Sequence, residues 1–183
     1  HLKNTVRYLT KQGWGYEIDA IRSGMGGSLD MELSACISRQ YTYEDCIPAD
    51  YDIIFITNPT AMHRESIRRY QDRTKSMFIE KPVLERGSHL LEPLPEKLTG
   101  YVACPLRYTK VLQYVKQNID CQRAYSVRAV CSTYLPGWHP GEDYRKSYSA
   151  RKSMGGGVGT DLIHEWDYLL WLFGKPKEVR TIQ

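Results

Sequence analysis

The sequence predicts a doubly wound α/β protein, in which helices cover both faces of a parallel sheet. Two apolar runs, at residues 52–57 and 75–80, have the character of strands, and the first is bounded by polar residues like a strand buried on both faces. Segments with the three-to-four spacing of amphipathic helices alternate with these runs. Strands that alternate with helices at this pace favour a parallel sheet.

The individual elements follow from local patterns. Helical spacing is expected at residues 1–12, 30–38, 61–70, 85–91, 108–118 and in a segment ending at Gly174. Strands are expected at residues 17–21, 52–57, 75–80, 98–104 and 123–134, the last from its alternation. The pattern weakens after Pro82, and Pro93 and Pro95 break the fourth helix. We place a domain change near Arg107, which gives domains at residues 1–106 and 107–183.

Composition narrows the functional classes. The 183 residues are 42% hydrophobic and 25% charged, as in globular proteins, and the formal charge of +4 is scattered. This gives weak support for anionic small molecules and little for nucleic acid. No apolar run approaches the length of a membrane span, and no signal-peptide pattern is present. The cysteines form no CxxC pair, and reduced thiols in a cytoplasmic protein are expected: Cys36, Cys46, Cys104, Cys121 and Cys131.

The first candidate site is the tripeptide Glu80-Lys81-Pro82 at the end of an apolar run. Proline disfavours helix for the residue before it, which places Lys81 at a strand end. Ligands bind at the carboxyl ends of strands in open α/β sheets, and a lysine held there suits proton transfer. The alternative is a surface ion pair beside a turn.

The second candidate site is the glycine-rich segment that begins at Gly155 and runs into a helix. On that helix an apolar stripe lies opposite a polar side that carries Asp161, His164 and Tyr168 at i, i+3 and i+7. The stripe consists of Leu162, Trp166, Leu169, Leu170 and Phe173. The glycines allow close backbone approach at a helix N-terminus. The alternative is a solvated or structural histidine.

Aromatic and basic residues are mixed between the two sites, at residues 134–152. Rings that stack on sugar faces, together with arginine and lysine, suit an anionic or nucleotide-linked sugar. The alternative is a solvated basic loop.

The three blocks together resemble the Gfo/Idh/MocA family of NAD(P)-dependent oxidoreductases. The blocks are Glu80-Lys81-Pro82 after a strand, the turn from Asn58 to His63, and the glycines followed by Asp161, His164 and Asp167. The resemblance implies a Rossmann domain at residues 1–106, followed by part of an α/β domain with an open, mostly antiparallel sheet. In many members the aspartate stands four residues before the histidine, whereas here it stands three before.

The resemblance also implies roles for particular residues. The expected catalytic residues are Lys81, His164 and Asp161. The expected cofactor-binding residues are Arg22, Ser23, Thr57, Asn58, Pro59, His63, Glu80 and Lys81. The expected substrate-binding residues are Arg107, Trp138, Tyr144, Arg145, Tyr148, Asp161 and Tyr168. No metal ligands are expected.

The cofactor expected from this relationship is NAD or NADP, with a preference for NADP. An acidic residue at the end of the second Rossmann strand normally accepts the ribose hydroxyls of NAD, whereas an arginine favours the extra phosphate of NADP. Here the strand ends at Ile21-Arg22-Ser23, and Asp19 stands in mid-strand.

The expected function is transfer of a hydride between a nicotinamide and a sugar, polyol or nucleotide-sugar-like substrate, by a cytoplasmic homodimer or homotetramer that binds neither nucleic acid nor membrane. One alternative is a glycosidase of the same fold that uses NAD transiently. The other is a truncated, non-catalytic remnant. Residues 1–4 resemble the stretch that directly follows the family's first strand and its Gly-x-Gly-x-x-Gly loop, and the sequence contains neither of these two features. We therefore expect the chain to be part of a longer protein and to bind NAD(P) weakly in isolation.

Overall fold

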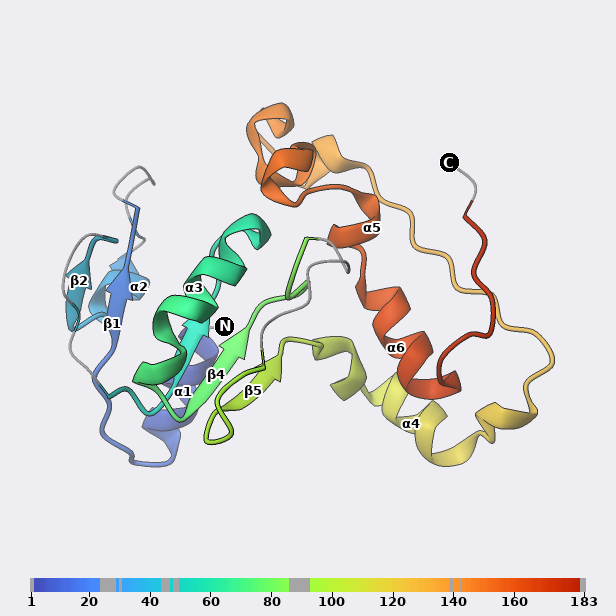
Figure 1. The fold of residues 1–183 in the computed structure, drawn as a ribbon, viewed down its shortest axis with the longest axis horizontal. Helices are drawn as coiled ribbons and strands as arrows, with labels where there is room; N and C mark the ends of the chain where they lie inside the picture. Colours follow the sequence, from blue (N-terminus) through green and yellow to red (C-terminus); the bar gives the residue numbers. More distant parts are fainter. Residues whose placement is uncertain are drawn as a thin grey trace. The chain divides into compact units, whose positions relative to one another are not determined.

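The computed structural model describes residues 2–23, 29, 31–43, 47, 50–85, 93–138, 140–141 and 143–181. The chain divides into two compact units, His1–Ala49 and Asp50–Gln183 (Figure 1). The predicted boundary near Arg107 lies within the second unit, and the division at residues 106 and 107 stays a prediction. Most of the helix predicted at residues 85–91, and Cys46, lie outside the described residues.

The first unit is a pair of parallel strands with two helices. Its elements are α1 (Leu2–Lys11), β1 (Asp19–Ile21), α2 (Met31–Ala35) and β2 (Arg39–Tyr41). The strands pair from Asp19 opposite Arg39 to Ile21 opposite Tyr41. Both helices and β1 confirm the sequence prediction, whereas β2 was not expected, because a three-residue strand with two exposed residues has almost no apolar pattern.

The second unit contains a three-stranded parallel sheet in the order β3-β4-β5. The strands are β3 (Ile54–Ile56), β4 (Ser76–Ile79) and β5 (Thr99–Val102), and α3 (His63–Tyr70) connects the first two. All four elements confirm the prediction within a few residues, and the predicted parallel α/β fold is confirmed. Each connection returns to the amino end of a neighbouring strand, so all three strands point their carboxyl ends to the same edge.

The core of this unit lies between one face of the sheet and α3. Ile56 and Met77 on that face are 4% and 1% exposed, and Ile67 on α3 is 1% exposed. Apolar residues at alternate strand positions thus meet the apolar side of the helix. This core fixes where the residues after β3 and β4 leave the sheet.

The other face of the sheet carries a row of aromatic rings. Phe55, Phe78 and Tyr101 are in register across the strands, with ring centroids 5.2 and 5.3 Å apart. Phe55 is 36% exposed and Tyr101 is 41% exposed. The expectation that residues 52–57 would be buried on both faces is therefore wrong: one face is buried and the other is partly open.

The remainder of the second unit is helical or irregular. Its α-helices are α4 (Lys110–Asn118), α5 (Val158–Asp161) and α6 (His164–Phe173). Short 3-10 turns are η1 (Thr60–Met62), η2 (Gln71–Arg73), η3 (Pro105–Tyr108), η4 (Cys121–Arg123), η5 (Leu135–Gly137), η6 (Tyr144–Lys146), η7 (Tyr148–Ala150) and η8 (Lys152–Met154). The helices α4 and α6 meet where Lys116 and Arg107 lie over the ring of Trp171, at 5.3 and 5.9 Å from its centroid.

Two predictions for this region are corrected. Residues 124–134 belong to no strand, because a strand needs a hydrogen-bonded neighbour and the described part of the chain provides none there. The helix expected to run without interruption to Gly174 is broken at Leu162–Ile163 into α5 and α6. Its expected buried stripe is largely open, since Trp166 is 49% exposed and Leu170 is 43% exposed, while the buried residue on α6 is Leu172.

Within the described ranges, α-helices are too short or too polar to cross a bilayer.

Candidate active site at the carboxyl ends of the strands

Lys81 stands at the carboxyl end of β4, as the sequence predicts. The Glu80 amide donates to the Ile56 carbonyl at 2.9 Å, which prolongs the pairing of β4 with β3 by one residue. Lys81 Nζ then donates to the Asp161 carbonyl at 2.8 Å. The two sequence blocks that carry Lys81 and Asp161 are 80 residues apart, and this bond joins them.

The bond from Lys81 is made at the point where the predicted helix is broken. In a continuous helix the Asp161 carbonyl would accept the amide of Glu165. Here the carbonyl accepts the lysine ammonium, and the chain makes a turn before α6 begins at His164.

His164 lies close enough to Lys81 for the two charges to interact. Burial lowers the pKa of the His164 ring below its usual 6.5, and the positive charge of Lys81 lowers it further. The carboxylates of Glu165, Asp167 and Glu80 act in the opposite direction without reversing the shift. The imidazole is therefore neutral at pH 7, and a neutral imidazole can accept a proton.

Asp161 and Tyr148 complete the group around Lys81. Asp161 is only 8% exposed. The pKa of the Tyr148 phenol is raised, chiefly by burial and in part by the charge of Asp161, against a hydrogen bond with Ser149 that lowers it. The structure thus brings the predicted catalytic residues together with one predicted substrate residue.

Arg107 faces Asp167. Its Nε donates to Asp167 Oδ2 at 2.8 Å, and its Nη2 donates to the other carboxylate oxygen. Burial alone would raise the pKa of Asp167, but hydrogen bonds from Arg107 and Cys104 bring it below its usual value. A bidentate pair of this kind holds η3 to α6. The guanidinium of Arg107 thus has a protein partner in Asp167. Its predicted role in substrate binding stays a prediction.

Four predicted cofactor residues follow β3. Thr57, Asn58 and Pro59 lie in the turn, and His63 is the first residue of α3. Thr57 is exposed, whereas His63 is 1% exposed. Asn58 Nδ2 donates to Ser66 Oγ at 2.8 Å, which ties the turn to α3. Thr57, Asn58, Pro59 and Glu80 therefore lie at one edge of the sheet beside Lys81, as predicted, and His63 lies behind them in the core.

Other predicted residues have local partners. Arg145 Nε donates to Asp143 at 3.0 Å and its guanidinium lies 5.8 Å from the Tyr144 ring centroid. Trp138 Nε1 donates to the Thr133 hydroxyl. The pKa of Tyr168 is raised by burial and then by the charge of Glu165, so this phenol lies near Glu165. Asp161 lies in α5, whereas His164 and Tyr168 lie in α6, so the expected i, i+3, i+7 series does not run along one helix.

Arg22 and Ser23 belong to the first unit and directly follow β1. The Arg22 amide donates to the Tyr41 carbonyl at 2.8 Å. Asp19 accepts from Arg39 Nε at 2.9 Å, and its side chain is 4% exposed. Asp19 was expected in mid-strand, but it is the first residue of β1, and its carboxylate is bonded to Arg39.

Sequence reasoning did not single out Cys104. It follows β5, the third strand to end at this edge, and its thiol lies close enough to Asp167 for each group to affect the pKa of the other. Burial, followed by Asp167, raises the pKa of the Cys104 thiol to about 11. The sequence could have indicated Cys104, because it is the last residue of the strand predicted at residues 98–104. The carboxyl end of that strand is expected at the same edge of the sheet as Lys81.

The glycines Gly155 and Gly156 approach the chain itself. A β-carbon at Gly155, where φ is +86°, would lie 2.8 Å from Thr60 Cβ. A β-carbon at Gly156 would lie 2.2 Å from the Tyr148 carbonyl oxygen. The close approach predicted from these glycines is present, and its partners are η1 and η7.

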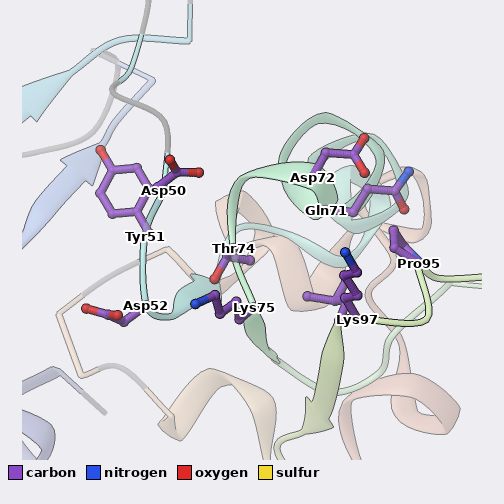
Figure 2. Close-up of a pocket in the computed structure, with 10 residues that line it drawn as sticks. Asp50, Tyr51, Asp52, Gln71, Asp72, Thr74, Lys75, Pro95 and Lys97 are labelled. Carbon is purple, nitrogen blue, oxygen red and sulfur yellow. The ribbon is translucent and has the colours of Figure 1, made fainter.

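A pocket of about 500 Å³ lies at the amino ends of the strands, on the edge that does not carry Lys81 (Figure 2). Its lining includes Asp50, Asp52 and Asp72 together with Lys75 and Lys97. Nowhere in the described ranges do three or more histidine, cysteine or acidic side chains form a group able to hold a metal ion.

Comparison with known proteins gives one curated relative and two solved structures of one enzyme. The chain is 30% identical over 132 residues to inositol 2-dehydrogenase of Rhizobium meliloti (strain 1021), and the match covers 69% of this chain and 38% of that enzyme. No protein-family model matches the sequence.

The solved structures are those of the WlbA (WbpB) dehydrogenase from Thermus thermophilus. One contains NAD and α-ketoglutarate and the other contains NAD and UDP-GlcNAcA. Both superpose with a TM-score of 0.62 over 96% of this chain and 60% of that protein, at 17% and 16% identity.

The parallel sheets with flanking helices define a Rossmann-like α/β protein. The match to inositol 2-dehydrogenase confirms the predicted relationship to the NAD-dependent oxidoreductases of the Gfo/Idh/MocA family. The chain spans 38% of the length of that relative.

The packing of Gly156 yields a stability prediction. Gly156→Ala should destabilise the protein by several kcal/mol, on the order of 2–5, because the methyl group overlaps backbone atoms that cannot move aside singly. Gly159→Ala is the matched control, since nothing lies within 4 Å of its β-carbon. Thermal denaturation of both variants measures the difference. Equal melting temperatures would contradict the packing described above.

Proposed function

We propose that the protein containing this chain is an NAD(P)-dependent oxidoreductase that moves a hydride between a nicotinamide and a carbinol carbon of a sugar-like substrate. The observation that supports this most directly is the bond from Lys81 Nζ to the Asp161 carbonyl, with His164 nearby. It gathers a cation, a neutral imidazole and a carboxylate at the edge of the sheet where ligands bind in such folds.

The turn after β3 and the end of β4 form the nucleotide side of the proposed site. Thr57 is exposed, and Glu80 and Lys81 are partly exposed, so groups that donate and accept hydrogen bonds are available there. A bound nicotinamide would supply the hydride chemistry, and the protein would supply position and charge. The related inositol dehydrogenase and the NAD-bound dehydrogenase structures support this class of cofactor.

His164 and Lys81 divide the remaining work. His164, neutral at pH 7, takes the proton of the substrate hydroxyl in the oxidative direction and returns it in the reductive direction. The ammonium group of Lys81 donates one hydrogen bond to the Asp161 carbonyl. Its two other hydrogens can bind and orient the substrate oxygen. Its charge also stabilises an oxygen that becomes negative as the proton leaves.

Substrate class is supported by the residues beside this group. Tyr148 lies near Asp161, and Tyr144 and Arg145 belong to the same run of 3-10 turns. Aromatic and basic side chains suit a sugar or a nucleotide-linked sugar. A polyol oxidised by one relative and the nucleotide-sugar ligand of the other dehydrogenase are consistent with this class.

A glycosidase of the same fold remains the second candidate. It would pass the hydride back to its own substrate within each turnover, whereas a dehydrogenase accumulates the changed nicotinamide. Net change in nicotinamide absorbance during turnover distinguishes the two. Cofactor titration distinguishes both from a non-catalytic remnant.

Lys81→Met tests the lysine. The change keeps the length of the stem and removes the ammonium that stabilises the developing charge, so kcat should fall by roughly 100- to 1,000-fold. Lys75→Met is the control, because Lys75 is exposed at the amino end of β4. Steady-state kinetics on the whole protein measure both. Turnover by Lys81→Met within a few-fold of the parent would rule out the assignment.

The state of His164 gives a pH prediction. Protonation of the ring removes the proton acceptor, and burial together with Lys81 places its pKa below 6.5. The acid limb of kcat/KM for oxidation should therefore be centred below pH 6.5. An acid limb centred above 6.5 would contradict the proposed environment of the imidazole. His164→Ala should abolish this limb and lower kcat with little change in thermal stability.

Cofactor preference is tested at Arg22. Asp19 is already bonded to Arg39, and Arg22 follows the strand, so we expect NADP to bind more tightly than NAD. Arg22→Gln should weaken NADP by roughly 10- to 100-fold, the range for one hydrogen bond to a charged group, and change NAD little. Arg123→Gln is a control on an exposed arginine of the second unit. Calorimetry with both cofactors measures the preference, and tighter binding of NAD would show the interpretation of Arg22 to be wrong.

A further inference from the structure

Among the described residues, His63 is the most deeply buried titratable side chain, with 1% of its surface exposed. The proposed reaction does not use it. It is the first residue of α3. We propose that His63 is a positioning residue that holds the turn carrying Lys81, a role that rests on the proposed function of Lys81.

Both ring nitrogens of His63 face backbone carbonyl oxygens. Nδ1 lies 3.0 Å from the Pro82 oxygen and 3.3 Å from the Val83 oxygen. Nε2 lies 2.9 Å from the Asn58 oxygen. Carbonyl oxygens only accept hydrogen bonds, so a ring nitrogen bonds to one of them only if it carries a proton; a neutral imidazole carries one such proton and a charged imidazole carries two. The ring lies between the turn after β3 and the turn after β4, and the proposed role requires the proton on Nδ1, which faces Pro82.

The Nδ1 contact acts on the residue directly after Lys81. On the other side of Lys81, the Glu80 amide is held by the Ile56 carbonyl at 2.9 Å. The backbone of Lys81 is thus held at both neighbouring residues, which fixes the direction in which its side chain leaves the sheet. Displacement of a catalytic group by about 1 Å can reduce the rate by two orders of magnitude.

The burial of His63 distinguishes this role from direct cofactor binding. A ring with 1% exposure offers almost no surface to a ligand, and each of its nitrogens already faces a protein oxygen. Any effect of His63 on a nucleotide would pass through the segments that the ring holds.

Two substitutions separate the two contacts. The amide nitrogen of asparagine can occupy the place of Nδ1, whereas the amide nitrogen of glutamine reaches the place of Nε2. His63→Asn therefore keeps a donor to Pro82, whereas His63→Gln places its donor at Asn58 and leaves Pro82 without one. Ile67→Val, at an equally buried position of the same helix, is the control for loss of core packing alone.

Steady-state kinetics and thermal denaturation of the whole protein give the result. We expect His63→Gln to lose roughly 10- to 100-fold in kcat with little change in KM for the cofactor, because only the Lys81 turn is released. His63→Asn should keep most of kcat although its melting temperature also falls, and Ile67→Val should keep all of it. Equal loss of kcat in both histidine variants, no loss in either, or a loss confined to KM for the cofactor would overturn the proposal.

A measurement on the unmodified protein does not depend on how the variants fold. Nitrogen NMR of the imidazole should show a proton on Nδ1 of His63, since that nitrogen donates to Pro82. A ring protonated on Nε2 alone would overturn the proposal. If Lys81→Met retained full activity, the proposed function would fail, while the spectrum would still decide whether His63 holds the Lys81 turn.

Discussion

The hydrogen bond from Lys81 Nζ to the Asp161 carbonyl is the interaction on which the site depends. It joins a sheet segment to a helical segment 80 residues later in the chain. It is made at the carbonyl of the last residue of α5, just before the chain turns and α6 begins at His164. The lysine charge then helps to keep His164 neutral. One contact thus joins the two segments and places beside His164 a charge that, after burial, lowers the pKa of the proposed proton acceptor.

Most of the helices and strands could be predicted because their signals are local. The apolar runs that became β3 and β4 are bounded by polar residues, and α1, α3 and α4 have clear helical spacing. The prediction failed where a distant contact decides the outcome. The strand β2 has little pattern of its own and exists through pairing with β1. The continuous helix expected to reach Gly174 is interrupted where a lysine from another part of the chain binds its backbone.

The site shows the same division between local and distant information. Lys81, Asp161 and His164 were predicted from short blocks of sequence, and the structure brings them together. What these blocks could not show is which partner each side chain has. The resemblance suggested a cofactor ligand at His63 and a substrate ligand at Arg107, and both roles stay predictions. The sequence did not show that His63 faces backbone oxygens or that Arg107 faces Asp167. Hydrogen-bond partners depend on the folded arrangement, since any of several neighbours could satisfy the same side chain.

The thiol of Cys104 has a consequence for the chemical durability of the site. Only the thiolate reacts readily with oxidants and electrophiles. With its pKa raised to about 11, chiefly by burial and then by Asp167, the thiol stays protonated at physiological pH. A cysteine can therefore stand next to the proposed reacting groups without becoming a point of attack by peroxide or by reactive carbonyl compounds.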